Sequence, residues 1–145
     1  MLKLNQTNLV GYIMKISTKG RYGIRAMFYL AQGNEVLSLK SLSNKTGVSE
    51  PYLEKIMGIL RKKNLISAIR GANGGYALRK TPNEITIGEI LRALENNMYL
   101  TSCNGGNCKS RNCPSKSIFN KIYVEINNVL DKMYLSDMLE GNVEG

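Results

Sequence analysis

The segment SLKSLSNKTGVSEPYLEKIMGILRKK, residues 38–63, decides the fold. Its first part predicts a short helix over 39–45, because Ser38 can accept a hydrogen bond from the first helical turn. Ser49 can cap a second helix, and Glu50 and Pro51 favour the start of that helix. The second helix carries apolar residues at helical spacing: Leu53, Ile56, Met57 and Leu60. Two helices joined by a glycine-containing turn predict a helix-turn-helix, although other helical hairpins share this pattern.

The segment that follows, LISAIRGANGGYALRK, predicts a β-hairpin. Two short apolar runs, residues 65–70 and 76–80, flank a glycine-rich tip. Three basic residues border that tip: Arg70, Arg79 and Lys80. Three glycines are expected to allow positive φ angles and a close approach to a phosphate backbone: Gly71, Gly74 and Gly75. A helix-turn-helix followed by a basic hairpin predicts a winged helix.

Two further helices complete the expected DNA-binding unit. One begins near Thr18, which is the expected N-cap, and ends near Gly33. Its apolar residues recur at helical spacing: Tyr22, Ala26, Tyr29 and Leu30. The other follows Thr86, with Glu89 three residues later as in a capping box. Its expected apolar face consists of Ile87, Ile90, Leu91 and Leu94.

The segment 115–139 predicts one long C-terminal helix. A stripe of apolar residues recurs every three or four positions along it: Ile118, Ile122, Ile126, Val129 and Met133. A domain this small cannot cover so apolar a helix, so a dimer interface is the simplest expectation. The alternative is that this helix folds back onto the core of its own chain.

The expected fold is therefore mainly α-helical with one small β-hairpin. Residues 14–97 form a winged helix-turn-helix, 98–117 a cysteine segment, and 118–145 a dimerisation helix with a tail. Residues 1–13 are weakly patterned and are expected to be an N-terminal extension outside the fold.

Positive charge is concentrated in one half of the chain. The net charge is +9, and thirteen of the twenty Lys and Arg residues, but only three of the eleven Asp and Glu, lie between Lys15 and Lys80. A generally basic surface would not be so uneven, and this distribution is typical of a domain that meets nucleic acid. No apolar run approaches the roughly 20 residues that span a bilayer. Neither a membrane segment nor a signal peptide is expected, so the predicted location is the cytoplasm.

All three cysteines lie in one segment, CNGGNCKSRNC, and the chain contains no histidine. Cys103, Cys108 and Cys113 are separated by four residues in each gap. In a reducing compartment, such a cluster favours metal ligands or redox thiols over disulfides. Zinc held by three cysteines and a water, reactive thiols, or the remnant of a lost site remain alternatives. No histidine, paired-carboxylate motif or nucleotide loop indicates an enzyme.

Three motifs extend these expectations through a family resemblance. They are MKISTKGRYGIRAM (14–27), PYLEKIMGILRKKNLISAIRGANGGYAL (51–78) and TIGEILRALE (86–95), followed by the cysteine segment. Together they resemble the winged-helix transcriptional regulators that include the iron–sulfur cluster regulator IscR, the nitric-oxide sensor NsrR and the cysteine-metabolism repressor CymR. The resemblance runs from Met14, where the family usually begins, to about Leu139.

The resemblance implies a homodimer that binds a roughly palindromic double-stranded DNA operator. The second helix would enter the major groove, with Tyr52 and Glu54 at positions that touch DNA. Arg70 would enter the minor groove, whose narrow regions attract arginine. The full set of expected DNA-binding residues is Ser49, Glu50, Pro51, Tyr52, Glu54, Lys55, Arg61, Arg70, Gly71, Asn73 and Gly74.

The resemblance also implies a 2Fe–2S cluster, one per monomer, held by Cys103, Cys108 and Cys113. The fourth ligand stays unknown, because the family's two alternative positions are occupied here by Lys116 and Arg21. The remaining candidates are Ser115, Ser117, Asn107, Asn112, another acidic residue, or a small thiol from solution.

The resulting prediction is a repressor whose DNA binding depends on the cluster and which controls genes of cluster assembly or of related sulfur or redox metabolism. One alternative is a cluster-free cysteine-metabolism repressor that acts with a protein partner or through thiol redox chemistry. Another is a small iron–sulfur redox protein that docks an acidic partner. The operator, the target genes, the signal and the DNA-binding form (apo or holo) do not follow from the sequence.

Overall fold

The structure is a computed structural model that describes residues 16–96, 98–99 and 111–141. Its elements, in chain order, are α1 (Thr18–Gly33), α2 (Leu39–Thr46), α3 (Glu50–Lys62), β1 (Ile66–Ile69), β2 (Gly75–Leu78), the 3-10 turn η1 (Pro82–Glu84), α4 (Ile87–Leu94), α5 (Lys116–Asp131) and the 3-10 turn η2 (Leu135–Met138). The predicted extension 1–13 lies outside the described residues, as do Cys103 and Cys108. The mainly helical winged fold is confirmed.

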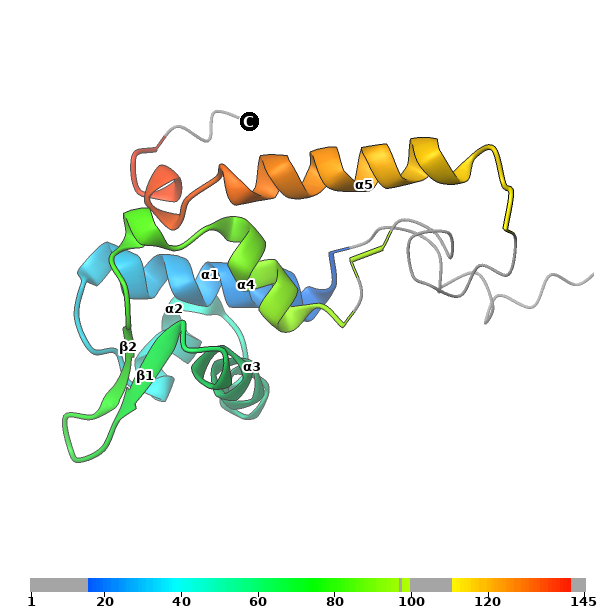
Figure 1. Cartoon of the computed structure of the whole chain (residues 1–145). Coiled ribbons are helices and arrows are strands. Elements are labelled where there is room, and N and C mark those ends of the chain that lie inside the picture. Colours follow the sequence, from blue (N-terminus) through cyan, green and yellow to red (C-terminus); the bar gives the residue numbers. More distant parts are fainter. Residues whose placement is uncertain (1–15, 97, 100–110, 142–145) are drawn as a thin grey trace, which may run out of the picture.

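Helices α1 to α4 enclose the hydrophobic core (Figure 1). The apolar stripe predicted for α3 is fully buried: Leu53, Ile56, Met57 and Leu60 are each 0% exposed. Met27 of α1, Leu42 of α2 and Ile90 of α4 are also 0% exposed. Burying one such side chain contributes about 1.5–3 kcal/mol. The core therefore holds α3 rigidly by one face and leaves its other face free.

The N-terminus of α1 differs from the prediction by one residue. The N-cap is Ser17 and not Thr18, because Ser17 has extended backbone angles and its hydroxyl accepts a hydrogen bond from the Gly20 N–H at 3.1 Å. The Ser17 N–H and hydroxyl both donate to Glu95 Oε1, at 2.9 and 2.7 Å. At the other end, the left-handed residue is Asn34, with φ of 46°, one position after the expected Gly33.

The helix-turn-helix has the predicted turn. Ser38 caps α2 by accepting from the Ser41 N–H at 3.1 Å. The helix continues to Thr46, one residue beyond the prediction, and Gly47 then adopts a left-handed conformation with φ of 73°. Ser49 precedes α3 as expected, but its side chain forms no capping hydrogen bond. The Ser49 hydroxyl is therefore available to other partners.

The predicted hairpin is an antiparallel pair with Ile66 opposite Leu78. A third segment, not predicted, joins it: Leu37 pairs with Tyr76 through N···O distances of 3.0 and 2.8 Å. A Cβ atom on Gly75 would collide with the Leu37 carbonyl oxygen, so glycine is needed for this close approach. The wing is thus anchored to the start of α2.

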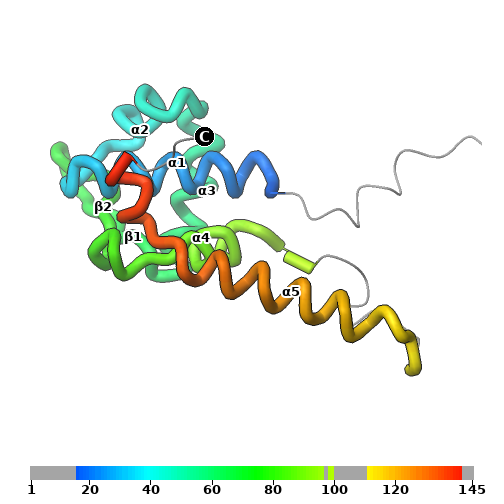
Figure 2. The backbone as a smooth tube through the Cα atoms, turned by 90° about the horizontal axis from the view of Figure 1, so that it is seen from above, coloured from blue at the N-terminus to red at the C-terminus, as the bar shows by residue number. Residues whose placement is uncertain are grey.

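The capping box predicted for α4 is present, since Thr86 and Glu89 exchange hydrogen bonds. Helix α5 is shorter than the predicted stripe and begins at Lys116, inside the segment assigned to the cysteines. Met133 lies beyond its C-terminal end, because the chain turns there to form a bridge between Thr86 and Tyr134. Figures 1 and 2 show α5 lying along α4 and extending past the winged unit at its N-terminal end.

Candidate nucleic-acid interface and the cysteine segment

One face of α3 presents the residues expected to contact DNA. Six of them are exposed: Ser49, Glu50, Pro51, Glu54, Lys55 and Arg61. The wing projects on the same side of the molecule as α3, opposite to α5 (Figure 1). A helix can enter a major groove while a neighbouring hairpin follows the backbone, and this arrangement matches that geometry.

Tyr52 is half-buried and has a packing role of its own. Its ring meets the Tyr22 ring edge-on, with centroids 6.0 Å apart. The Arg25 guanidinium lies 5.3 Å from the centre of the Tyr22 ring, and its Nη1 donates to the Thr46 carbonyl at 2.8 Å. Arg25 thus joins α1 to the turn of the helix-turn-helix. Sequence reasoning did not find this role, because an exposed arginine on a helix gives no periodic signal.

The three basic residues around the wing have different surroundings. Arg79 donates to the Asn64 side chain at 3.1 Å, and Lys80 pairs with Glu89 at 3.4 Å. Arg70 is exposed and forms no hydrogen bond or ion pair with the residues that the structure describes. Arg79 and Lys80 therefore stabilise the base of the wing, while Arg70 is available at its tip.

The tip glycines act for two separate reasons. Gly71 has a φ of 114° and open space around it, so it provides the backbone turn. Gly74 does not have the expected positive φ. A Cβ on Gly74 would instead strike the Ile69 carbonyl oxygen, and its N–H donates to the Gly71 carbonyl at 3.0 Å. Together with the exposed Asn73, these glycines form a narrow tip that can approach a groove closely.

The charges on this face suit a duplex. Lys55, Arg61 and Lys62 are exposed along α3, where they can neutralise phosphates. Glu50 and Glu54 are acidic, and phosphates repel carboxylates. A carboxylate in the major groove can, however, accept a hydrogen bond from cytosine N4. The face therefore combines cationic groups of the kind that bind a phosphate backbone with groups of the kind that distinguish bases.

The cysteine segment enters the described residues only near its end. Cys113 is partly exposed, and its Sγ lies 3.3 Å from Ser115 Oγ. The Ser115 hydrogen bonds lower the pKa of the Cys113 thiol, with a smaller contribution from Lys116. Among the candidate fourth ligands, Ser115 lies next to the Cys113 thiol. The Ser117 hydroxyl instead lies 3.4 Å from the Pro114 carbonyl oxygen. Asn107 is outside the described residues. Within the described ranges, no three His, Cys, Asp or Glu side chains come together as a metal site.

Helix α5 has two faces of different character. Leu130, at the edge between the two faces, packs partly against the core, whereas Ile118, Ile122 and Val129 on the outward face are 52%, 41% and 57% exposed. The outward face forms a shallow groove of about 480 Å³, lined by Ile118, Lys121, Ile122, Glu125, Ile126, Val129 and Leu130. No residue of α5 is fully buried among the residues that the structure describes. None of the helices in the described ranges is both long and apolar enough to cross a membrane.

Comparison with known proteins agrees with this geometry. The Rrf2 family model, described as iron-dependent transcriptional regulator, matches residues 16–141. The chain is 50% identical over 84 residues to the HTH-type transcriptional regulator CymR of Bacillus subtilis (strain 168), a match that covers 57% of this chain and 61% of CymR. It is 31% identical over 130 residues to the HTH-type transcriptional regulator IscR of Klebsiella pneumoniae (strain 342), covering 87% of this chain and 80% of IscR.

Solved structures give the same picture. T. potens IscR superposes with a TM-score of 0.72 at 41% identity, covering 94% of this chain and 92% of that one. CymR (YrzC), the global cysteine regulator of B. subtilis, superposes with a TM-score of 0.76 at 37% identity, covering 90% and 99%. These relatives are transcriptional regulators and not enzymes, which confirms the expectation from the sequence.

Proposed function

The chain belongs to the Rrf2 family of DNA-binding transcriptional regulators, and from this premise we propose that it is a dimeric cytoplasmic repressor of a two-fold-symmetric operator. Its DNA binding is controlled at the three-cysteine segment by a 2Fe–2S cluster. The observation that carries the DNA-binding part is the placement of the exposed face of α3 and the tip of the wing on one side of the molecule (Figure 1).

In this proposal the two DNA-binding elements have separate tasks. The first turns of α3, with Ser49, Glu54 and Lys55, lie in the major groove and contact base edges and phosphates. Arg70 enters the adjacent minor groove, supported by the turn at Gly71. Each good base contact is worth about 1–3 kcal/mol of discrimination. The fold does not specify the operator sequence or the target genes, which a selection experiment would identify.

The dimer is proposed to form through the outward face of α5. Its exposed stripe is apolar, and a second copy would remove that stripe from water at about 25 cal/mol per Å². Lys121 and Glu125 line the same groove one turn apart. In an antiparallel pair related by a two-fold axis, Lys121 of one copy lies near Glu125 of the other. Hydrophobic and charged groups would then both favour a second copy of this helix.

The residues available fit a 2Fe–2S cluster in their chemistry. Such clusters are held by thiolates, and the lowered pKa of Cys113 favours the thiolate form. Cys103, Cys108 and Cys113 would be three ligands, with a fourth ligand that is not histidine because the chain has none. A cluster with one exchangeable ligand would respond readily to cluster supply or oxidants. When bound, it would supply the signal-sensitive group, and the chain's own residues would transmit its presence to the dimer.

A second candidate is favoured by the 50% identity to CymR over 84 residues. Under this alternative the protein is a cluster-free repressor of cysteine metabolism, controlled by a protein partner or by the redox state of its thiols. The DNA-binding face and the dimer would be unchanged. Only the use of the cysteine segment separates the two candidates.

The test has two stages. A pool of randomised duplexes is first incubated with the purified protein, and enrichment of one symmetric sequence is the expected result. The protein is then purified without oxygen, and its visible spectrum, iron and acid-labile sulfide are measured. About two irons and two sulfides per chain are expected, together with altered operator affinity once the cluster is removed. A protein that stays colourless after reconstitution, yet selects an operator, would overturn the proposed cluster and favour control by thiols, zinc or a protein partner, with the cysteine-metabolism candidate first.

A further inference from the structure

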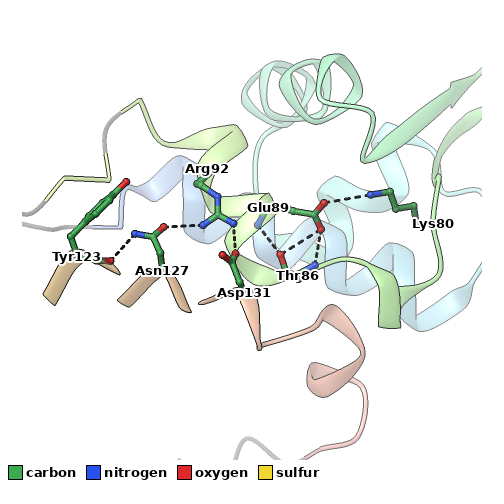
Figure 3. Close-up of polar contacts among 7 residues, drawn as sticks. All are labelled: Lys80, Thr86, Glu89, Arg92, Tyr123, Asn127 and Asp131. Carbon is green, nitrogen blue, oxygen red and sulfur yellow. Dashed lines mark hydrogen bonds and ion pairs between the residues drawn. The ribbon is translucent and has the colours of Figure 1, made fainter. Parts of the chain in front are cut away.

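An arginine on α4 holds one turn of α5 (Figure 3). Arg92 Nη1 donates to Asn127 Oδ1 at 2.9 Å, and Nη2 pairs with the Asp131 carboxylate. The Asn127 Nδ2 in turn donates to the Tyr123 carbonyl at 2.9 Å, which keeps Oδ1 directed at Arg92. Asn127 and Asp131 are one helical turn apart, so the guanidinium makes contacts at two heights along α5. Two contacts at different heights resist rotation as well as separation.

A glycine of α4 lies directly against this ion pair. Gly88 of α4 is buried, and a Cβ atom there would meet Asp131 Oδ1 and the Arg92 guanidinium. A larger residue there would require the ends of the Asp131 and Arg92 side chains to shift. We call the set Gly88, Arg92, Asn127 and Asp131 the α4–α5 joint.

The remaining attachment of α5 is mainly at its C-terminal end. Beyond that end, the Ile87 N–H donates to the Met133 carbonyl at 2.7 Å, and the Leu135 N–H donates to the Ile85 carbonyl at 2.8 Å. Leu135 is fully buried. These contacts fix the position of the C-terminal end of α5, but no residue of the helix itself is fully buried. The direction in which α5 leaves that point therefore depends on the joint, together with the packing of Leu130 against the core and of the Tyr123 ring against the Tyr99 ring, whose centroids are 5.5 Å apart.

The other side of the joint belongs to the DNA-binding unit. Glu89, three residues before Arg92, caps α4 through Thr86 and pairs with Lys80 at the end of the wing at 3.4 Å (Figure 3). Helix α4 also contributes Ile90, Leu91 and Leu94 to the core that holds α3. A rotation at the joint thus changes the angle between α5 and both DNA-contacting elements.

The size of the expected effect follows from the length of the helix. Sixteen residues of α5 extend for about 24 Å at 1.5 Å per residue. A rotation of about 10° at one end moves the other by roughly 4 Å, and one base-pair step is about 3.4 Å. A small change at the joint is therefore enough to alter the distance between two DNA-binding units by one base pair.

We propose that Arg92 and Asp131 are positioning residues that fix the angle between the dimer helix and the DNA-binding unit, and so determine the spacing of operator half-sites that this protein accepts. The inference rests on the proposed dimeric, operator-binding function. Neither residue belongs to α3 or to the wing, because Arg92 lies on α4 and Asp131 on α5. Their side chains are 38% and 48% exposed, and exposed ion pairs contribute little to folding, so their replacement leaves the fold intact.

The test uses a charge swap. The variants are Arg92→Glu, Asp131→Arg and the double variant, which has the net charge of the native protein. Each is measured on synthetic duplexes that carry the selected half-sites at the native spacing and at one base pair less or more. The native protein is expected to bind the duplex with the native spacing about tenfold more tightly than the other two duplexes. In each single variant, this difference in affinity is expected to be less than about threefold. The double variant is expected to recover the native preference.

Two controls separate positioning from other effects. Affinity for a duplex with one half-site, and the dimer mass in sedimentation, are expected to be unchanged in all three variants. A spacing preference that survives in both single variants would overturn the proposal, as would a half-site affinity that falls in parallel with operator affinity. A native protein that selects no operator would instead overturn the proposed function on which the inference rests.

Discussion

The winged unit and helix α5 use similar apolar residues with opposite results. In the winged unit, Ile56 and Ile90 are 0% exposed. On α5, Ile118 and Val129 are 52% and 57% exposed. The first region is completed by its own chain, because four helices and a hairpin surround one core. The second region has an apolar face that the described part of the chain leaves uncovered, as expected for the proposed interface with a second copy.

The two regions also differ in how their helices begin. In the winged unit, α1, α2 and α4 each start with a side-chain capping hydrogen bond, and only α3, whose start faces the proposed DNA side, does not. Helix α5 starts after Ser115, whose side chain makes no capping hydrogen bond. An uncapped helix start is easily frayed. The start of α5 lies three residues beyond Cys113, where binding of a cofactor or a change in thiol state could order it.

The largest expected effect is on association through α5. Replacing Ile122 with Asp puts a carboxylate into the apolar stripe of both copies, and burying such charges costs about 5 kcal/mol or more. We expect Ile122→Asp to be monomeric in sedimentation while its circular dichroism stays native. Val124→Asp is the matched control, because Val124 is 50% exposed but does not line the groove. Dissociation of both variants, or of neither, would contradict the proposed interface.

A second prediction compares one isoleucine from each region. Ile56→Ala leaves a cavity in the core and should lower the free energy of unfolding by about 2–5 kcal/mol. Ile122→Ala should lower the urea midpoint only at protein concentrations where the native chain is dimeric, because its contribution comes from association. The measurement is urea denaturation at two protein concentrations. A concentration-independent loss for Ile122→Ala would indicate that α5 folds back onto its own core.

Local signals were enough to predict most of the winged unit. The stripe of α3, the cap at Ser38 and the capping box at Thr86 are all encoded within a few neighbouring residues, and each is confirmed. The same local reasoning placed the first cap at Thr18 instead of Ser17. Ser and Thr can both cap a helix, and Ser17 is held at this position by Glu95, which is distant in sequence.

The features that the sequence did not predict are contacts between distant segments. The pairing of Leu37 with Tyr76 and the turn that buries Leu135 have no repeating pattern, since each is a single bridge or a short 3-10 turn. The ion pair between Arg92 and Asp131 also joins two segments that are distant in the sequence. The expected roles of the DNA-binding residues and of the cysteines stay predictions, because DNA and the cluster are partners and not parts of the chain.

The third prediction compares the tip of the wing with the rest of the basic surface. Arg70→Ala should weaken operator binding by about 1–3 kcal/mol and reduce the salt dependence of binding by about one ion. The free energy of unfolding should not change, because Arg70 has no partner among the described residues. Lys132→Ala removes the same charge from an exposed site next to α5 and serves as the control. Equal losses in both variants would mean that only overall charge matters.

The smallest expected effect comes from comparing Ser49 and Thr86, which are the N-cap residues of α3 and α4. Thr86→Ala removes a working cap, which typically costs about 0.5–2 kcal/mol of folding stability. Ser49→Ala should cost less than about 0.5 kcal/mol, because the Ser49 side chain makes no capping bond and is exposed. A hydroxyl that does not stabilise its own helix is available for DNA, so Ser49→Ala should instead weaken operator binding. Thermal unfolding and operator titration of both variants measure the two effects separately. A stability loss at Ser49 equal to that at Thr86, with operator affinity unchanged, would assign Ser49 to the fold and remove it from the DNA-binding face.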